Sequence, residues 1–417
     1  MDAAVLLQKD LQIGCIAAVI MYMLAGPERQ RGRPSGRREA VMYKIMRTLG
    51  GFIRRETVLF LSIVLALISA VFVPPSREYI SYIDWDTLFL LFSLMAVVKG
   101  FQKTGLFLYL GGRMLKKTTT TRQMLLILVF LPFLFSMVIT NDVSLITFVP
   151  FGLAVLRMTG QERLAVPLLV LQTIAANLGS MLTPMGNPQN LYLYGRAGIG
   201  FWGLCKWMLP YVLLSAAGLL VLILLRRSVP ISAEAVEVKW EHPKALPFCA
   251  AGFVLCLLGI FHWVPDAIIA LIVLIFLLFA DRKLLASVDY SLLGTFFAFF
   301  IFVGNLGNIE GFQELIASLL EKNVELVAIL VSQITSNVPA ALLLSNFTSD
   351  WHGLVVGCNL GGLGTLVASM ASLISFKLLG KEYPAKRGKY LLVFTVYNIG
   401  FLAALLAGGA LMRAVFT

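Results

Sequence analysis

Two polar stretches, Thr140-Asn141-Asp142 and Thr335-Ser336-Asn337-Val338-Pro339, interrupt segments of the chain that are otherwise apolar. A second kind of break follows each of them, beginning at Asn177-Leu178-Gly179 in the first half and at Asn359-Leu360-Gly361 in the second. A lipid bilayer tolerates a carboxylate or non-helical backbone at depth only where they line a cavity in the protein. Paired breaks of this kind indicate the binding region of a membrane transporter.

The composition predicts an all-α polytopic membrane protein. Of the 417 residues, 59% are hydrophobic and 13% are charged, and the mean hydropathy is +0.87. A soluble protein of this size carries about a quarter charged residues. Apolar runs recur along the whole chain, and we predict about 11 membrane segments from their lengths. The five cysteines form no C-x-x-C pair, so we expect no disulfide framework and no metal site other than one for Na⁺.

The net charge of +12 is explained by the distribution of basic residues among loops. When the basic stretch 27–55 is placed in the cytoplasm, most Lys and Arg residues fall in cytoplasmic loops, as the positive-inside rule requires. This places the N-terminus outside, before a short first span at 11–26, in the plasma (inner) membrane. Nucleic-acid binding would need basic residues interleaved with aromatic ones on a single exposed face, so we expect no nucleic-acid partner.

The two halves of the chain align as repeats, with Gly105 matching Gly311, and Asn141 matching Asn337. The charge pattern puts the amphipathic stretch 105–118 inside and its counterpart 311–322 outside, so we predict inverted repeats. The predicted parts are an N-terminal span and basic loop at 1–56, inverted repeat 1 at 57–225, a linker and connecting span at 226–264, and inverted repeat 2 at 265–417.

Segment length favours re-entrant hairpins at the polar breaks. The segments 324–334 and 339–347 hold about ten residues each, whereas a membrane span needs roughly 20. We therefore predict a re-entrant hairpin around Asn337 and, by symmetry, another around Asn141. Each half also contains an interrupted helix, near 177–188 in the first and within 352–378 in the second.

The chemistry expected at these breaks is ion binding. Helix N-termini at the hairpin tips favour an anion, and backbone carbonyls freed at the interruptions suit Na⁺. The predicted substrate-binding residues are Thr140, Asn141, Ser144, Thr183, Gly186, Asn187, Asn190, Ser336, Asn337 and Thr365. The predicted coupling-ion residues are Asp142, Asn141, Asn177, Gly179, Asn337, Asn359 and Gly361. We expect no cofactor apart from Na⁺ or H⁺ as the coupling ion.

Asp142 is the one acid that we place deep in the membrane, and two roles are open to it. It either caps the following helix or binds a proton or Na⁺. The Asn and Gly residues of the breaks likewise either allow close helix packing or contribute to the site. The chain has no H-E-x-x-H, G-x-S-x-G or P-loop motif, so we expect no enzyme and no catalytic residues.

Three motifs resemble those of the ion transporter superfamily. Asn141-Asp142, followed by Leu145 and Pro150, resembles the N-D-x-x-L…P signature of arsenite permeases and NhaD-type sodium–proton antiporters. The stretch 183–190 resembles their T-P-x-G-[DSN]-P-x-N motif, and the stretch 336–339 resembles the matching second hairpin. The resemblance covers about 57 to 411 and extends to citrate transporters and divalent anion–sodium symporters. It implies a scaffold domain, a transport domain that carries both hairpins, elevator-like movement and a homodimer.

The leading hypothesis is an ion-coupled secondary transporter that moves a small anion or oxyacid by elevator-like alternating access. The alternatives are a sodium–proton antiporter, an arsenite or antimonite efflux permease and, as a different class, an anion channel. The sodium-coupled dicarboxylate branch resembles S-N-T at both tips. This chain has Thr140-Asn141-Asp142 and Ser336-Asn337-Val338 instead, which argues against a dicarboxylate.

Overall fold

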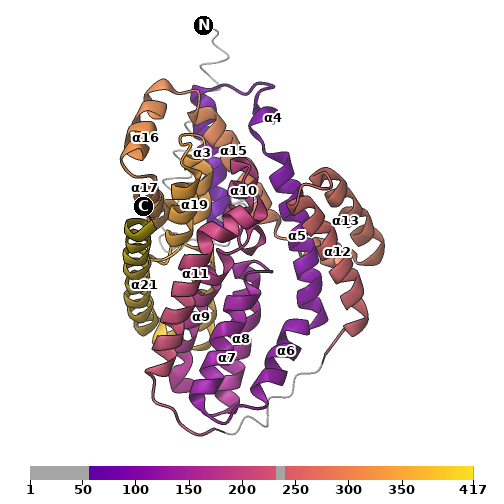
Figure 1. Ribbon diagram of the computed structural model, residues 1–417. Coiled ribbons are helices and arrows are strands. Elements are labelled where there is room, and N and C mark those ends of the chain that lie inside the picture. The colour runs from indigo at the N-terminus through magenta and orange to yellow at the C-terminus, as the bar shows by residue number, and fades with distance from the viewer. Residues whose placement is uncertain (1–55, 232–239, 417) are drawn as a thin grey trace, which may run out of the picture. The chain divides into compact units, whose positions relative to one another are not determined.

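The computed structural model describes residues 56–231 and 240–416 (Figure 1). The predicted first span at 11–26 lies outside these residues. The described chain is almost entirely helical, and no strand occurs in it. Because helices satisfy their own backbone hydrogen bonds, this is one of the two architectures that a bilayer permits. The predicted all-α polytopic fold is confirmed.

The helices follow one another in three groups. The first group is α3 (Thr57–Phe72), α4 (Tyr79–Tyr82), α5 (Trp85–Thr104), α6 (Leu106–Leu115), α7 (Thr121–Phe135), α8 (Asn141–Met158), α9 (Ala165–Ser180), α10 (Pro188–Ala197) and α11 (Phe201–Leu224). The connecting group is α12 (Leu246–Ile260), α13 (Asp266–Ala280) and α14 (Arg282–Ala286). The last group is α15 (Tyr290–Leu306), α16 (Glu310–Lys322), α17 (Val324–Thr335), α18 (Asn337–Leu344), α19 (Trp351–Leu360), α20 (Met370–Glu382) and α21 (Arg387–Phe416).

The order of elements repeats along the chain. The seven helices from α5 to α11 correspond one by one to the seven from α15 to α21, and the short amphipathic helices α6 and α16 hold equivalent places. The predicted breaks are present in both series, between α7 and α8, α9 and α10, α17 and α18, and α19 and α20. The inverted orientation of the two series in the membrane stays a prediction.

Helix length separates two classes of segment. Among the described helices, six are long and apolar enough to cross a membrane: α5, α8, α9, α11, α12 and α21, three of them extended by a short 3-10 turn. By contrast, α17 and α18 have 12 and 8 residues. At 1.5 Å per residue they reach about 18 and 12 Å, well short of the roughly 30 Å of hydrocarbon. Length therefore supports the predicted re-entrant hairpin in the second half. In the first half α8 is long enough to cross the membrane, so length does not decide whether α7 and α8 form a re-entrant hairpin.

The described chain divides into two compact units, and the smaller one consists of residues up to Ile83 together with Tyr290–Phe312. In it α3 packs along α15. The buried amide of Asn305 donates hydrogen bonds to Ser69 Oγ at 2.9 Å and Tyr79 Oη at 3.0 Å. Polar side chains thus pair with one another inside this unit, as burial requires.

The larger unit comprises Asp84–Asp289 and Gln313–Thr417, and its core is α9. Every residue of α9 except Pro167 is buried. A helix that is buried on all sides must be surrounded by other helices, and α9 lies beside α7 and α8 in Figure 1 and also contacts α20 and α21. All the predicted site residues lie in this unit.

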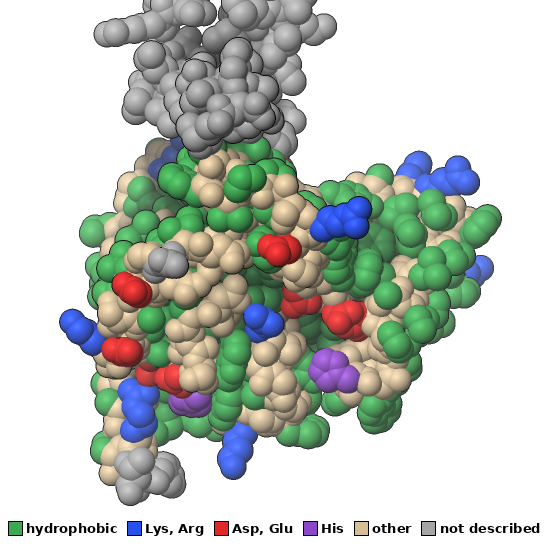
Figure 2. Space-filling model, turned by 90° about the horizontal axis from the view of Figure 1, so that it is seen from above, with side chains coloured by type: hydrophobic (Ala, Val, Ile, Leu, Met, Phe, Trp, Pro, Cys, Tyr) green, Lys and Arg blue, Asp and Glu red, His purple; other side chains and the backbone are tan. Residues whose placement is uncertain are grey.

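The outer helices have the opposite character. In α12 and α21, only 17% and 22% of the membrane-length window is buried. Large apolar side chains such as Trp202, Phe248 and Phe279 are exposed. Such an apolar helix surface is stable in contact with lipid and not with water. Figure 2 views the molecule from above relative to Figure 1, and on this face acidic and basic side chains lie among the hydrophobic ones.

Candidate functional site

The first hairpin tip is the turn that precedes α8. Thr140 adopts an extended backbone conformation and caps the helix, because its hydroxyl accepts a hydrogen bond from the Val143 N–H at 3.5 Å. Asn141 is the first helical residue, and its side-chain oxygen accepts from the Asp142 N–H at 2.8 Å. The Asn141 amide nitrogen is thereby directed away from the helix and toward α9.

The second tip is a single residue, Ser336, between α17 and α18. Its φ of 78° and ψ of 156° lie in a region that glycine adopts readily and other residues adopt only under strain. The strained turn lets the Asn337 N–H and the Ser336 hydroxyl both donate to the Ala368 carbonyl, at 3.0 and 3.3 Å. The second tip is thus bonded to the interruption between α19 and α20.

Asn177, near the end of α9, is the point where these elements meet. Its side-chain oxygen accepts from Asn141 Nδ2 and from Ser369 Oγ, both at 3.1 Å. Its amide nitrogen donates to Ser372 Oγ at 3.4 Å. Since Ser369 directly follows Ala368, both hairpin tips and both interruptions come together here. We name Asn141, Asn177, Asn337, Ser369 and Ser372 the asparagine junction.

A second cross-repeat contact lies at the other interruption. Asn359 of α19 accepts from Asn187 Nδ2 at 3.2 Å and donates to the Asn190 side-chain oxygen at 2.6 Å. Asn187 also caps α10 by accepting from the Asn190 N–H at 2.9 Å. The amide of Asn359, from the second repeat, therefore forms hydrogen bonds at the helix break of the first repeat. In the same way, Ser369 of the second repeat donates a hydrogen bond to Asn177 of the first.

The junction is almost completely buried and carries no formal charge. Asn141, Asn177 and Asn337 are 6%, 7% and 5% exposed. Helices α8, α18 and α20 all begin at the junction, so the positive ends of their dipoles are directed at it. Amides can offer N–H groups to an anion or oxygen atoms to a cation. The arrangement can therefore bind either kind of small ion without a fixed opposing charge.

Asp142 lies beside the junction and is half-buried. Within the described residues its carboxylate forms no hydrogen bond and no ion pair. Lys99 of α5 and Asp289 act on it electrostatically. Lys99 contacts Gln102 at 3.4 Å, and Gln102 in turn donates to Thr147 of α8 at 3.1 Å. Gln102 thus links α5 to α8 near the first tip.

Three predicted site residues are engaged in other contacts. Ser144 donates to the Pro132 carbonyl at 3.2 Å and so links the two helices of the first hairpin. Thr183 donates to the Met137 carbonyl and ties the first interruption to the first tip. Thr365 is exposed and bonded to Gln333, away from the asparagine junction.

The predicted glycines allow close backbone approach. A Cβ atom on Gly179 would lie 2.0 Å from the Phe133 carbonyl oxygen, and one on Gly186 would lie 2.0 Å from the Ser180 carbonyl oxygen. On Gly361 a Cβ would lie 2.6 Å from Ser332 Oγ. These contacts explain the glycines by packing, one of the two roles left open by the sequence.

Sequence reasoning missed four residues that the structure brings into the region. Ser369 and Ser372 complete the asparagine junction. Gln333 donates to the Gly361 and Leu363 carbonyls at 2.9 and 3.0 Å and so satisfies the backbone of the second interruption. Lys99 is the fourth. Gln333 could have been found as a lone amide in an apolar segment, whereas nothing in the sequence separates Ser369 and Ser372 from packing serines.

Comparison with known proteins finds membrane transporters. A family model described as citrate transporter matches residues 41–349. The chain is 33% identical over 356 residues to the uncharacterized transporter MJ0456 of Methanocaldococcus jannaschii, covering 84% of this chain and 96% of that protein. It is 32% identical over 317 residues to the inner membrane protein YbiR of Escherichia coli, covering 74% and 83%. These matches confirm the resemblance that the motifs indicate.

We expect Gly179→Ala to destabilise the protein. The added methyl group would meet the backbone carbonyl of Phe133, which cannot move without distorting α7, and overpacking of this kind costs about 2 kcal/mol. The matched control is Gly195→Ala in α10, because a Cβ there meets nothing within 4 Å. Thermal unfolding of both variants in detergent measures the effect. Equal Tm values would contradict the packing role of Gly179.

Strain at Ser336 is testable with two substitutions that both remove the hydroxyl. Ser336→Gly relieves the backbone strain and Ser336→Ala retains it, so we expect the glycine variant to be more stable by about 1 kcal/mol. The difference in Tm between the two variants reports this energy. If the alanine variant were as stable as the glycine variant, the turn would not be strained.

Proposed function

Because this chain belongs to the citrate transporter family, we propose that it is an ion-coupled secondary transporter for a small anion or oxyacid. Family membership makes it a membrane transporter. The substrate class and the coupling are our proposal. The observation that carries it is the asparagine junction, where three helices begin around buried amides.

Helix N-termini and neutral amides favour an anionic substrate in a dry site. The positive ends of α8, α18 and α20 meet at the junction, and an anion there interacts favourably with the three helix dipoles. To bind the first N–H groups of α8, the anion would replace the capping bonds to Thr140 and Asn141. The amide side chains of Asn141 and Asn337 add donors. We propose that the transported anion displaces part of the hydrogen-bond network within the junction.

Asp142 supplies a physical reason for coupling. When ionised, it repels an anion held at the neighbouring Asn141. Two like charges about 5 Å apart interact by about 3 kcal/mol at an effective dielectric constant of 20, which is roughly a hundredfold in affinity. Binding of H⁺ or Na⁺ to the carboxylate removes this repulsion, so the cation and the anion bind together. This linkage is symport.

We further propose an elevator-like alternating-access movement. The hairpins α7–α8 and α17–α18 are tied to the interrupted helices by buried hydrogen bonds that cross between the repeats. Breaking several of these in a dry interior would cost more than moving the group as one body. We also propose that the protein forms a homodimer and lies in the plasma membrane with its N-terminus outside.

A sodium–proton antiporter is the second candidate, and the surroundings of Asp142 favour it. The carboxylate forms no hydrogen bond within the described residues, and the negative charge of Asp289 acts on it more strongly than the positive charge of Lys99 does. Such a carboxylate can bind Na⁺ or H⁺ in alternation without an organic substrate. In this case the asparagine junction would supply amide oxygens to the cation.

Transport by the purified full chain in lipid vesicles separates the two candidates. We expect uptake of a labelled anion that depends on an inward H⁺ or Na⁺ gradient, tested with citrate-like anions, phosphate-like anions and arsenite. A pH-sensitive dye inside the vesicles is read in parallel. A Na⁺-driven change of internal pH in the absence of every tested anion would contradict the anion-transporter proposal and support the antiporter.

Substitution of Asp142 tests the coupling site. We expect Asp142→Asn to reduce gradient-driven uptake at least about tenfold and to abolish its dependence on pH, because the neutral amide cannot bind a proton. The control is Asp86→Asn, since Asp86 is exposed and occupies the same second position in α5 that Asp142 occupies in α8. If both variants behaved alike, or if Asp142→Asn kept the pH dependence, Asp142 would only stabilise its helix.

A further inference from the structure

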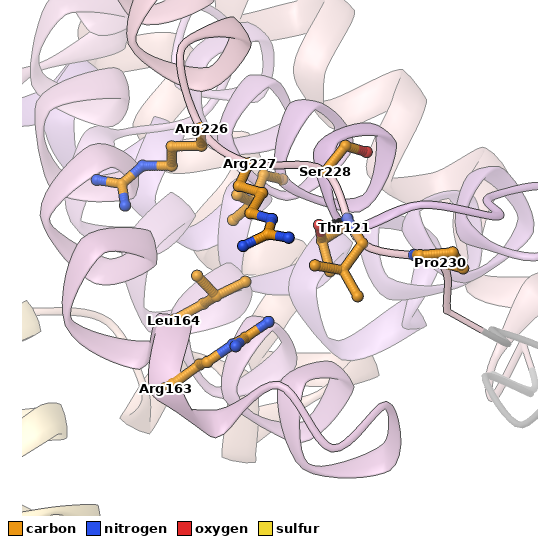
Figure 3. A pocket seen from close by; sticks show the side chains of 9 residues that line it. Thr121, Arg163, Leu164, Arg226, Arg227, Ser228 and Pro230 are labelled. Atoms are coloured by element: carbon orange, nitrogen blue, oxygen red, sulfur yellow. Dashed lines mark hydrogen bonds between the residues drawn. The ribbon is translucent and has the colours of Figure 1, made fainter.

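A basic cavity lies away from the asparagine junction, at the other end of α7. Its volume is about 670 Å³, and its lining includes Arg163, Arg226, Arg227, Thr121 and Ser228 (Figure 3). None of the predicted substrate or coupling residues lines it. We name it the arginine pocket.

Backbone hydrogen bonds hold the pocket in a defined shape. The segment after α11 runs past the start of α7, where the Thr121 N–H donates to the Val229 carbonyl at 2.9 Å and the Val229 N–H donates to Thr121 Oγ1 at 3.0 Å. The Ile231 N–H donates to the Thr119 carbonyl at 2.9 Å. The wall that carries Arg226 and Arg227 is therefore fixed, although it belongs to no helix.

Two of the arginines face each other across this pocket. In Figure 3 the guanidinium groups of Arg163 and Arg227 point toward one another past Leu164, whereas Arg226 points away. Arg226 donates to Tyr397 Oη at 3.3 Å. Among the residues that the structure describes, neither Arg163 nor Arg227 is in an ion pair. Two facing cations repel each other, and an anion between them would turn this repulsion into attraction.

The remaining lining suits a phosphate at a membrane surface. Thr121 is the first residue of α7, so the positive end of that helix adds to the field of the arginines. Guanidinium groups bind phosphate oxygens in a bidentate fashion. Leu125, Leu164 and Val229 provide an apolar wall beside the charged one. The positive-inside rule places Arg163, Arg226 and Arg227 on the cytoplasmic side, where anionic lipids are concentrated.

We propose that the arginine pocket binds a phosphate group, supplied by the headgroup of an anionic phospholipid. The apolar wall favours a lipid over free phosphate, because the glycerol and acyl carbons would cover it. A bound headgroup links the start of α7, the end of α11 and the connection between α8 and α9. It thereby stabilises the cytoplasmic ends of the helices that surround α9.

The test uses the full chain, purified in detergent, and titrated with dioctanoyl phosphatidylglycerol, dioctanoyl phosphatidylcholine or inorganic phosphate. Native mass spectrometry counts the bound molecules and Tm reports the affinity. We expect phosphatidylglycerol to bind and to raise Tm. Each arginine near the surface contributes about 1 kcal/mol, so Arg163→Gln/Arg227→Gln should weaken this binding about 30-fold and Arg227→Gln alone about 5-fold.

A matched pair of lysines controls for general electrostatic attraction. Lys377→Gln/Lys381→Gln removes the same charge from exposed positions on α20, on the same predicted side, and should leave binding unchanged. Arg163 and Arg227 are exposed, so their variants should fold. Equal losses in the two double variants, or no loss in Arg227→Gln, would overturn the proposal. Failure of phosphatidylglycerol to bind would overturn it as well. Inorganic phosphate that bound more tightly than the lipid would overturn the lipid as the source.

Discussion

The requirement that a buried amide be hydrogen-bonded in a medium without water governs this structure. Each break in a helix leaves polar backbone and side-chain groups that must find partners inside the protein. Here the partners come from the other half of the chain: Ser369 for Asn177, and Asn359 for Asn187 and Asn190. The breaks are stable only as a set, so the two repeats assemble around one region.

The same requirement shapes the chemistry. A site built from amides and helix ends is polar without being charged, which allows it to hold an ion and to release it again. The asymmetry between the halves then becomes important, because the first tip carries Asp142 where the second carries Val338. Because Gly179 and Gly186 have no side chain, the backbone at these residues packs directly against the carbonyl groups of Phe133 and Ser180.

Much of the fold could be predicted from the sequence, since apolar runs and polar breaks reflect the membrane directly. The two interrupted helices and the short second hairpin lie where the sequence places them. The asparagine junction could be predicted only in part. Ser369 lies 192 residues from Asn177, in a stretch that has no counterpart of Pro184 or Asn187, so no local pattern reveals their contact. No local pattern reveals the electrostatic effect of Lys99 on Asp142 either, because it depends on how α5 packs.

The central claim is that the substrate binds where Asn177 joins the two repeats. The most direct test is calorimetric titration of purified Asn177→Ala with the anion that the intact protein transports. The account predicts that its affinity falls at least about tenfold, because the variant loses contacts to Asn141, Ser369 and Ser372 together. Asn308→Ala, in the smaller unit, should bind normally. Unchanged affinity in Asn177→Ala would contradict the account.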